Sequence, residues 1–289
     1  MYTLLLLVLL IAIMNSYLEK YSSTFKILFQ IQLILSYPFA AGILERGNSS
    51  FVVLVLLAAA LRFRRSKDRR KKEIALFSIA IAAGFKVYPA VFGLLYLSEK
   101  RYREAFRLTI YGVLSFSVRL FFCGTRGMRQ FFANQLLIQS TEYSSFTVPS
   151  ILSRLPWLGT YSALRGVVYC VLLVAVLVLA LKARDYFIKI GLLVSIITLF
   201  PKWSGNFTMA FFSLPLLVYL SDKPKFTDLF FWMDLAFWAI FSLLAVSPQE
   251  IASLKLSALS YFIPCIACYS IMFMFAFVAI SDIRACTES

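Results

Sequence analysis

A lysine inside an apolar stretch is the residue in this sequence most able to do chemistry. Lys86 lies in the segment 84–89 (GFKVYP), and apolar runs precede and follow that segment. A charged side chain at the centre of a membrane helix costs about 2.5–3.5 kcal/mol, so such a residue is expected to pair with another polar group or to have a function. A lysine in this place can bind a phosphate. The alternative is a lysine that pairs with a carboxylate or extends its ammonium group to the membrane surface.

A second candidate group is the run Glu45, Arg46, Gly47 and Asn48, directly before an apolar segment that begins near Ser49. Gly47 gives the backbone the freedom for a turn, and Asn48 or Ser49 can cap the helix that follows. The N-terminus of that helix carries partial positive charge and favours an anion. Arg46 would add a bidentate donor for a phosphate. Plain helix capping explains Asn48 equally well, but it leaves Glu45 and Arg46 unexplained.

The sequence excludes catalysis by histidine and supports no metal centre. It contains no histidine, so imidazole can neither bind a metal nor transfer a proton. Cys265 and Cys268 form a CxxC pattern, but that pattern falls inside a long apolar segment at helical spacing. Cysteines in such a segment are more often small packing residues than metal ligands. We therefore expect neither a metal site nor a cofactor.

The composition predicts an all-α polytopic integral membrane protein. The chain of 289 residues is 61% hydrophobic and only 15% charged, where a soluble domain has about 25% charged residues. Its mean hydropathy is +0.82. Apolar runs such as Leu4–Ile13 and Val167–Leu181 are continuous rather than alternating, which is typical of helices with lipid as their solvent.

The net charge of +15 predicts membrane lipids, and no nucleic acid, as partners. Eight of the 29 basic residues lie in the single connecting segment 62–72, between two apolar stretches. Basic clusters beside membrane spans usually set the orientation of the chain and contact anionic lipids.

The apolar segments predict about nine transmembrane helices in a single domain, 1–289. Aromatic and apolar residues within 124–165 predict a long outer-face loop whose amphipathic segments lie along the membrane surface. The predicted spans are near 2–18, 24–44, 49–61, 106–123, 166–182, 188–201, 207–221, 226–246 and 256–280.

The stretch 74–98 is best explained as a broken, re-entrant helix pair rather than one further span. A break at 84–89 leaves 20 of the 29 basic residues on the inner side, whereas a single helix would leave ten. Pro89 cannot donate a backbone hydrogen bond and disfavours a helical conformation at Tyr88. Because non-helical backbone at membrane depth survives only inside protein or beside a wet cavity, the break is expected near a site.

This topology places the N-terminus outside and the C-terminus in the cytoplasm. The first helix has neither a basic leader nor a small-residue cleavage site, so it does not resemble a cleavable signal. An outside N-terminus without leading charge predicts that earlier helices are missing from this chain.

The order of these motifs resembles the glycosyltransferase 87 family of the GT-C class of membrane glycosyltransferases. The resemblance rests on the run "RGN" at 46–48, a basic inner loop, and the pattern K-x-Y-P at 86–89. The segments 199–201 (LFP) and 213–216 (SLPL) resemble the C-terminal helices of that family. The similarity covers residues 30–225.

The resemblance implies a GT-C-like hexosyltransferase in a bacterial-type plasma membrane. Such enzymes move a sugar, often mannose, from a polyprenyl-phosphate donor to a glycolipid or polysaccharide acceptor on the outer face. Lys86 and Tyr88 match the part of the family pattern that would bind the lipid phosphate. Arg46 and Asn48 match the outer rim of that site.

The catalytic residue stays unassigned. In related enzymes an acidic residue on the first outer loop deprotonates the acceptor, and this chain begins after the helix that precedes that loop. Glu45 is the remaining candidate for a general base, although pairing with Arg46 explains it as well. The sequence therefore predicts a chain that is N-terminally incomplete or inactive.

Two other classes of function stay open. A transporter or flippase of lipid-linked sugar would show repeated halves with paired broken helices, and the sequence shows one such break, in 74–98. The other alternative is a non-catalytic membrane partner of a synthase.

Overall fold

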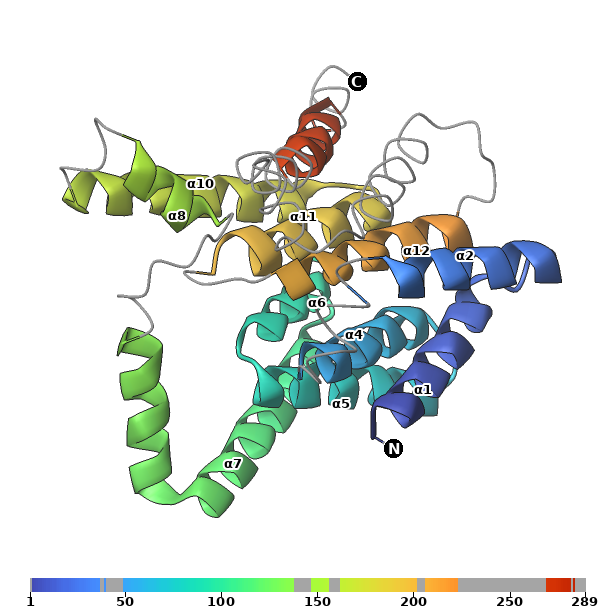
Figure 1. Ribbon diagram of the computed structural model, residues 1–289, viewed down its shortest axis with the longest axis horizontal. Coiled ribbons are helices and arrows are strands. Elements are labelled where there is room, and N and C mark those ends of the chain that lie inside the picture. The colour runs from blue at the N-terminus through green and yellow to red at the C-terminus, as the bar shows by residue number, and fades with distance from the viewer. Residues whose placement is uncertain are drawn as a thin grey trace, which may run out of the picture.

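The computed structural model describes residues 2–36, 39, 49–137, 147–155, 162–201, 206–222, 269–281 and 283. Every regular element within these ranges is a helix (Figure 1), so the predicted all-α class is confirmed for the described part of the chain. The elements are α1 (Tyr2–Tyr17), α2 (Ser23–Leu35), α4 (Ser50–Arg64), α5 (Arg69–Phe85), the 3-10 helix η2 (Tyr88–Gly93), α6 (Leu94–Ser98), α7 (Tyr102–Leu137), α8 (Val148–Arg154), α10 (Ser162–Lys182), α11 (Tyr186–Leu199), the 3-10 helix η4 (Asn206–Phe212), α12 (Ser213–Asp222) and an unlabelled helix, Tyr269–Ser281.

Most of the apolar helices described are shorter than a membrane crossing requires. One described helix, Ala163–Lys182, is long and apolar enough to cross a bilayer. Six other apolar helices have 10–17 residues, whereas a crossing takes about 20. The helix α2 ends at Leu35, because Ser36 is extended and its N–H bonds back to the last turn. The predicted number of about nine spans is therefore not confirmed and stays a prediction.

Large apolar side chains cover the outside of several helices. Leu4 on α1 is 64% exposed, Phe106 on α7 is 68% exposed and Val171 on α10 is 61% exposed. Exposed apolar surface on this scale marks contact with lipid or with another protein. It agrees with the membrane environment predicted from the composition.

The core is built around α4 and α11. All fourteen residues of α11 are buried, and twelve of the fifteen residues of α4 are buried. The helix α4 packs against α1 and α5, and α11 packs against α10 and α12 (Figure 1). The helix 269–281 also approaches α11 closely, because a Cβ at Gly191 would lie 2.4 Å from the ring of Phe275.

The predicted break within 74–98 is present. The helix α5 ends at Phe85, Lys86 is extended with φ −144° and ψ 133°, and Pro89 lies in the first turn of η2. After the break the chain returns alongside α4. Lys86 contacts Ser50 at the start of α4, whereas Glu99, just past α6, contacts Arg64 at its end. The element therefore runs out along α4 and back, as a helix pair broken at its tip must.

The helix α7 extends beyond the span predicted at 106–123. It runs to Leu137 with a kink at Gly124, whose φ of +64° a residue with a side chain rarely adopts. Figure 1 shows α7 running out of the bundle and bending, with the part beyond the bend standing apart from the other described helices. Part of the predicted outer loop 124–165 is therefore helical, in α7 and α8. Its position on the outer face of a membrane stays a prediction.

Candidate functional site

The first site candidate lies where the tip of the broken element meets the N-terminal end of α4. The Nζ atom of Lys86 donates a hydrogen bond of 2.7 Å to the Oγ atom of Ser50. Ser50 is the first residue of α4 and is fully buried, while Lys86 is half-buried. The lysine ammonium is therefore held at the N-terminus of a buried helix.

Two further elements position this lysine. The ammonium group lies 5.9 Å from the centroid of the Tyr88 ring, within the range of a cation–π contact. The Tyr88 ring packs edge-on against Phe211 of η4, with centroids 5.9 Å apart. On the other side of the break, a Cβ at Gly84 would lie 2.2 Å from the Oγ atom of Ser115, so α5 and α7 touch there. The tip thus contacts α4, α7 and η4.

The electrostatics of this site favour an anion. The free N–H groups in the first turn of a helix carry a charge equivalent to about +0.5, and Lys86 adds a full positive charge beside them. Ser49, at the N-cap position of α4, makes no capping hydrogen bond with its side chain, and the other predicted cap, Asn48, lies outside the described residues. Two sources of positive potential therefore meet at the tip of the broken element.

The structure brings together only part of the predicted site. Lys86 and Tyr88 lie side by side, and their predicted role in binding a lipid phosphate stays a prediction. The candidate base Glu45 and the rim residues Arg46 and Asn48 lie outside the described residues. Ser50 was not predicted as a site residue, because a serine at the start of a helix is usually a cap and gives no sign of a contact 36 residues away.

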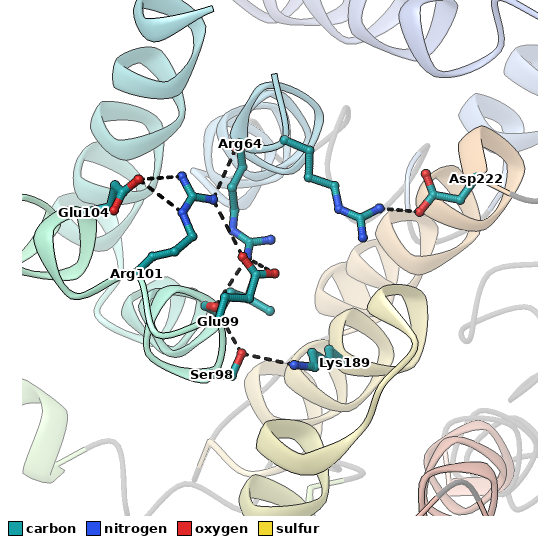
Figure 2. Close-up of polar contacts among 9 residues, drawn as sticks. Arg64, Ser98, Glu99, Arg101, Glu104, Lys189 and Asp222 are labelled. Atoms are coloured by element: carbon teal, nitrogen blue, oxygen red, sulfur yellow. Dashed lines mark hydrogen bonds and ion pairs between the residues drawn. The ribbon is translucent and has the colours of Figure 1, made fainter. Parts of the chain in front are cut away.

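The opposite end of α4 holds an ionic network around one buried arginine (Figure 2). Arg64, the last residue of α4, is completely buried and forms an ion pair with Glu99. It donates a hydrogen bond of 3.3 Å to the carbonyl oxygen of Leu95. Its guanidinium also lies between two rings, 5.1 Å from the centroid of Tyr96 and 5.0 Å from that of Tyr186. This arginine joins α4, the end of α6 and the start of α11.

Arg101 extends this network to α7. It donates hydrogen bonds of 2.9 and 3.2 Å to Oε1 of Glu104, and its Nη1 lies 3.6 Å from Oε2 of Glu99 (Figure 2). Burial alone would raise the pKa of Glu104. The hydrogen bonds to its carboxylate and the charges of Arg101 and Lys72 outweigh that effect, so the pKa lies below its ordinary value.

Two further contacts join the same end of the bundle to α12 and α11. Arg65 forms an ion pair of 2.6 Å with Asp222, and Lys189 donates a hydrogen bond of 3.2 Å to Ser98 (Figure 2). Helix ends from distant parts of the sequence therefore meet here through ion pairs and hydrogen bonds. This arrangement is typical of contacts that stabilise helix packing rather than of a substrate site.

Metal chemistry has no visible support in the described residues. No group of three or more Cys, Asp or Glu side chains that could hold an ion is found among them. The expectation that the protein needs no cofactor stays a prediction.

Comparison with known proteins identifies the family. The model of glycosyltransferase family 87 matches residues 1–201. No curated protein and no solved structure matches the chain. The match includes α4, the broken element and the Lys86–Ser50 contact, and it confirms the resemblance carried by the motifs at 46–48 and 86–89. Members of this family are membrane proteins. The chain belongs to glycosyltransferase family 87.

Proposed function

We propose that this protein transfers a sugar, most simply mannose, from a polyprenyl-phosphate donor to a glycolipid or polysaccharide acceptor. The transfer takes place on the outer face of a plasma membrane. The N-terminus of the chain lies outside and the C-terminus lies in the cytoplasm. Family membership supports a sugar donor and a sugar acceptor in general. The geometry of the tip supports the phosphate-bearing donor in particular.

The observation that carries this proposal is the position of Lys86 at the N-terminus of α4. During transfer an acceptor oxygen attacks C1 of the sugar, and the bond from C1 to the phosphate oxygen breaks. The leaving polyprenyl phosphate gains negative charge as that bond breaks. A fixed ammonium group and a helix N-terminus stabilise this charge without having to reorganise. The Ser50 hydroxyl keeps the ammonium group in place.

The residues just before α4 complete the proposal. Asn48 and Arg46 precede Ser50 by two and four residues, so chain length alone limits their Cα atoms to about 7 and 14 Å from it. At such distances Arg46 and Asn48 can serve as further donors to the phosphate or the sugar. Glu45 is the candidate that accepts the proton of the acceptor hydroxyl.

The test is sugar transfer from a decaprenyl-phosphate sugar by the purified chain in nanodiscs. Lys86→Met should lower the rate about 100-fold or more, as expected when a fixed donor to a developing anion is removed. Lys86→Arg, which keeps the charge, should retain part of the rate.

Lys189→Met is the matched control. Lys189 also donates a hydrogen bond to a serine, but at the opposite end of the bundle. It should leave the rate within a few-fold of the original. Equal rates for the original chain and Lys86→Met would refute the role of Lys86. Transfer from a nucleotide sugar, with none from the decaprenyl-phosphate sugar, would refute the donor.

A further inference from the structure

Six exposed basic residues lie near the ionic network at the C-terminal end of α4 but make none of its contacts. They come from the loop after α4, the first turn of α5 and the start of α7. One of the six, Lys100, lies in the connection between α6 and α7 and has a positive φ of 56°. We refer to this set as the basic rim. Its members are Lys67, Arg69, Arg70, Lys71, Lys100 and Arg103.

The parts of the basic rim lie together in space. Glu73 of α5 forms an ion pair with Arg107 of α7 and accepts a hydrogen bond of 3.1 Å from Tyr111. Arg101 donates a hydrogen bond of 3.5 Å to the carbonyl oxygen of Arg64. These contacts hold the beginnings of α5 and α7 beside the end of α4. The six cations therefore form one surface and not three separate ones.

Most of the acidic residues described near this surface pair with basic residues outside the rim. Asp68 is the exception, because it lies between Lys67 and Arg69 and accepts a hydrogen bond from the backbone N–H of Arg70, so it offsets one of the six positive charges. The described ion pairs here are Glu19 with Arg62, Glu73 with Arg107, Glu99 with Arg64 and Arg101, Glu104 with Arg101, and Asp222 with Arg65. Among the described residues the positive charge of the basic rim is thus not balanced by these carboxylates.

The kind of partner follows from the exposed side chains next to the rim on α5. Arg70 is followed at spacings of four and three residues by Ile74 and Phe77, each 48% exposed. Residues at this spacing share one face of a helix. An apolar stripe on α5 thus begins at a rim arginine.

The helix α7 has the same pattern. Arg103 is followed at spacings of three and four residues by Phe106, which is 68% exposed, and Ile110, which is also exposed. Each helix therefore presents an arginine followed by a stripe of exposed apolar side chains. That order fits a bilayer interface, with charge at the level of the headgroups and apolar side chains among the acyl chains.

We propose that the basic rim is a binding surface for anionic phospholipid headgroups, located between the first turns of α5 and α7. Nucleic acid or an acidic protein would match the charge but not the two apolar stripes. The surface is separate from the Lys86 tip, since it lies at the opposite end of α4. The proposal therefore does not depend on the proposed function.

The test compares phosphatidylglycerol with phosphatidylcholine by native mass spectrometry of the full chain. The original chain should retain phosphatidylglycerol preferentially. Each basic residue near an anionic surface contributes roughly fivefold in binding, so Arg70→Gln with Arg103→Gln should lower the preference about 25-fold. Raising the ionic strength from about 0.01 M to 1 M shortens the Debye length from about 30 to 3 Å and should weaken the preference of the original chain.

The matched control is Arg126→Gln with Arg129→Gln. This pair removes two exposed arginines from the part of α7 beyond its kink. It should keep the preference. The proposal is overturned if the original chain shows no preference, if the rim pair keeps it, or if both pairs lose it equally. Because both rim arginines are exposed, the melting temperature in phosphatidylcholine should not change. If it does change, Lys67→Gln with Lys71→Gln provides the same comparison.

Discussion

The two ends of α4 use positive charge in opposite ways. At the C-terminal end, the buried guanidinium of Arg64 faces the carboxylate of Glu99 and two aromatic rings. At the N-terminal end, the ammonium of Lys86 is held by the hydroxyl of Ser50 beside the positive end of the same helix. The first arrangement places opposite charges together. The second adds positive charge to positive potential.

This difference indicates that one end of α4 serves stability and the other end serves binding. Opposite charges at the helix C-terminus are stabilising in themselves, since basic residues also interact well with the negative end of the helix dipole. A lysine at a helix N-terminus is unfavourable by the same argument, and an anion would reverse the sign. The C-terminal end should therefore matter for stability and the N-terminal end for binding. The following substitutions test that division, from the largest expected effect to the smallest.

The largest effect on stability is expected for Glu99→Ala. It leaves the fully buried Arg64 without its carboxylate, and removing one partner of a buried pair costs about 3 kcal/mol or more. The free energy of unfolding, measured by titration with a denaturing detergent in mixed micelles, should fall by that amount. Glu19→Ala is the control, because its pair with Arg62 is more exposed. A fall of the same size in both variants would contradict the special role of the buried pair.

A smaller loss is expected where α5 meets α7. Gly84→Ala places a Cβ 2.2 Å from Oγ and 3.3 Å from Cβ of Ser115, so the Ser115 hydroxyl must rotate away and the two helices must separate slightly. Overpacking of this kind costs about 1–3 kcal/mol. Gly84→Ala combined with Ser115→Ala should recover part of the stability. Gly112→Ala has open space around its Cβ and serves as the control, with no loss expected from overpacking. Equal melting temperatures for Gly84→Ala and Gly112→Ala would argue against the close contact.

Ser50→Ala should act on donor binding more than on stability. Loss of the hydrogen bond to Lys86 removes about 0.5–1.5 kcal/mol. That corresponds to a Kd for a polyprenyl phosphate that is weaker by a factor of about 2 to 13. Ser50→Thr keeps the hydroxyl and should lose less. If Ser50→Ala lowered only the melting temperature and left this Kd unchanged, Ser50 would be a packing residue.

The smallest effect is expected for Asp222→Asn. The pair with Arg65 is short, at 2.6 Å, but the side chains are 50% and 40% exposed. Exposed ion pairs contribute about 0–1 kcal/mol and weaken in salt. The free energy of unfolding should change by less than 1 kcal/mol, and less again at high ionic strength. A loss of stability as large as that of Glu99→Ala would show that the ionic network at the C-terminal end of α4 is one cooperative unit.

The sequence predicted the break in 74–98 because its signals are local. Pro89 removes a donor, and the distribution of basic residues requires both ends of the element to lie on one side. The structure agrees in both respects. Lys86 and Tyr88 were singled out together because both belong to one short pattern, and their role in binding a lipid phosphate stays a prediction.

The long-range contacts could not be predicted in this way. Glu99 pairs with Arg64 across 35 residues, and Ser50 contacts Lys86 across 36. No local pattern marks either partner, because each contact depends on how the helices pack. Arg64 was grouped with seven other basic residues as a topology signal. Its complete burial shows that one member of such a cluster can be a core residue.

The most direct measurement is the affinity of the chain in nanodiscs for decaprenyl phosphate and for uncharged decaprenol. The original chain should bind the phosphate more tightly than the alcohol. Lys86→Met should lose that preference while its melting temperature is maintained, and Lys189→Met should keep it. An unchanged preference in Lys86→Met, or an equal loss in both variants, would contradict the assignment of the N-terminal end of α4 as the phosphate site.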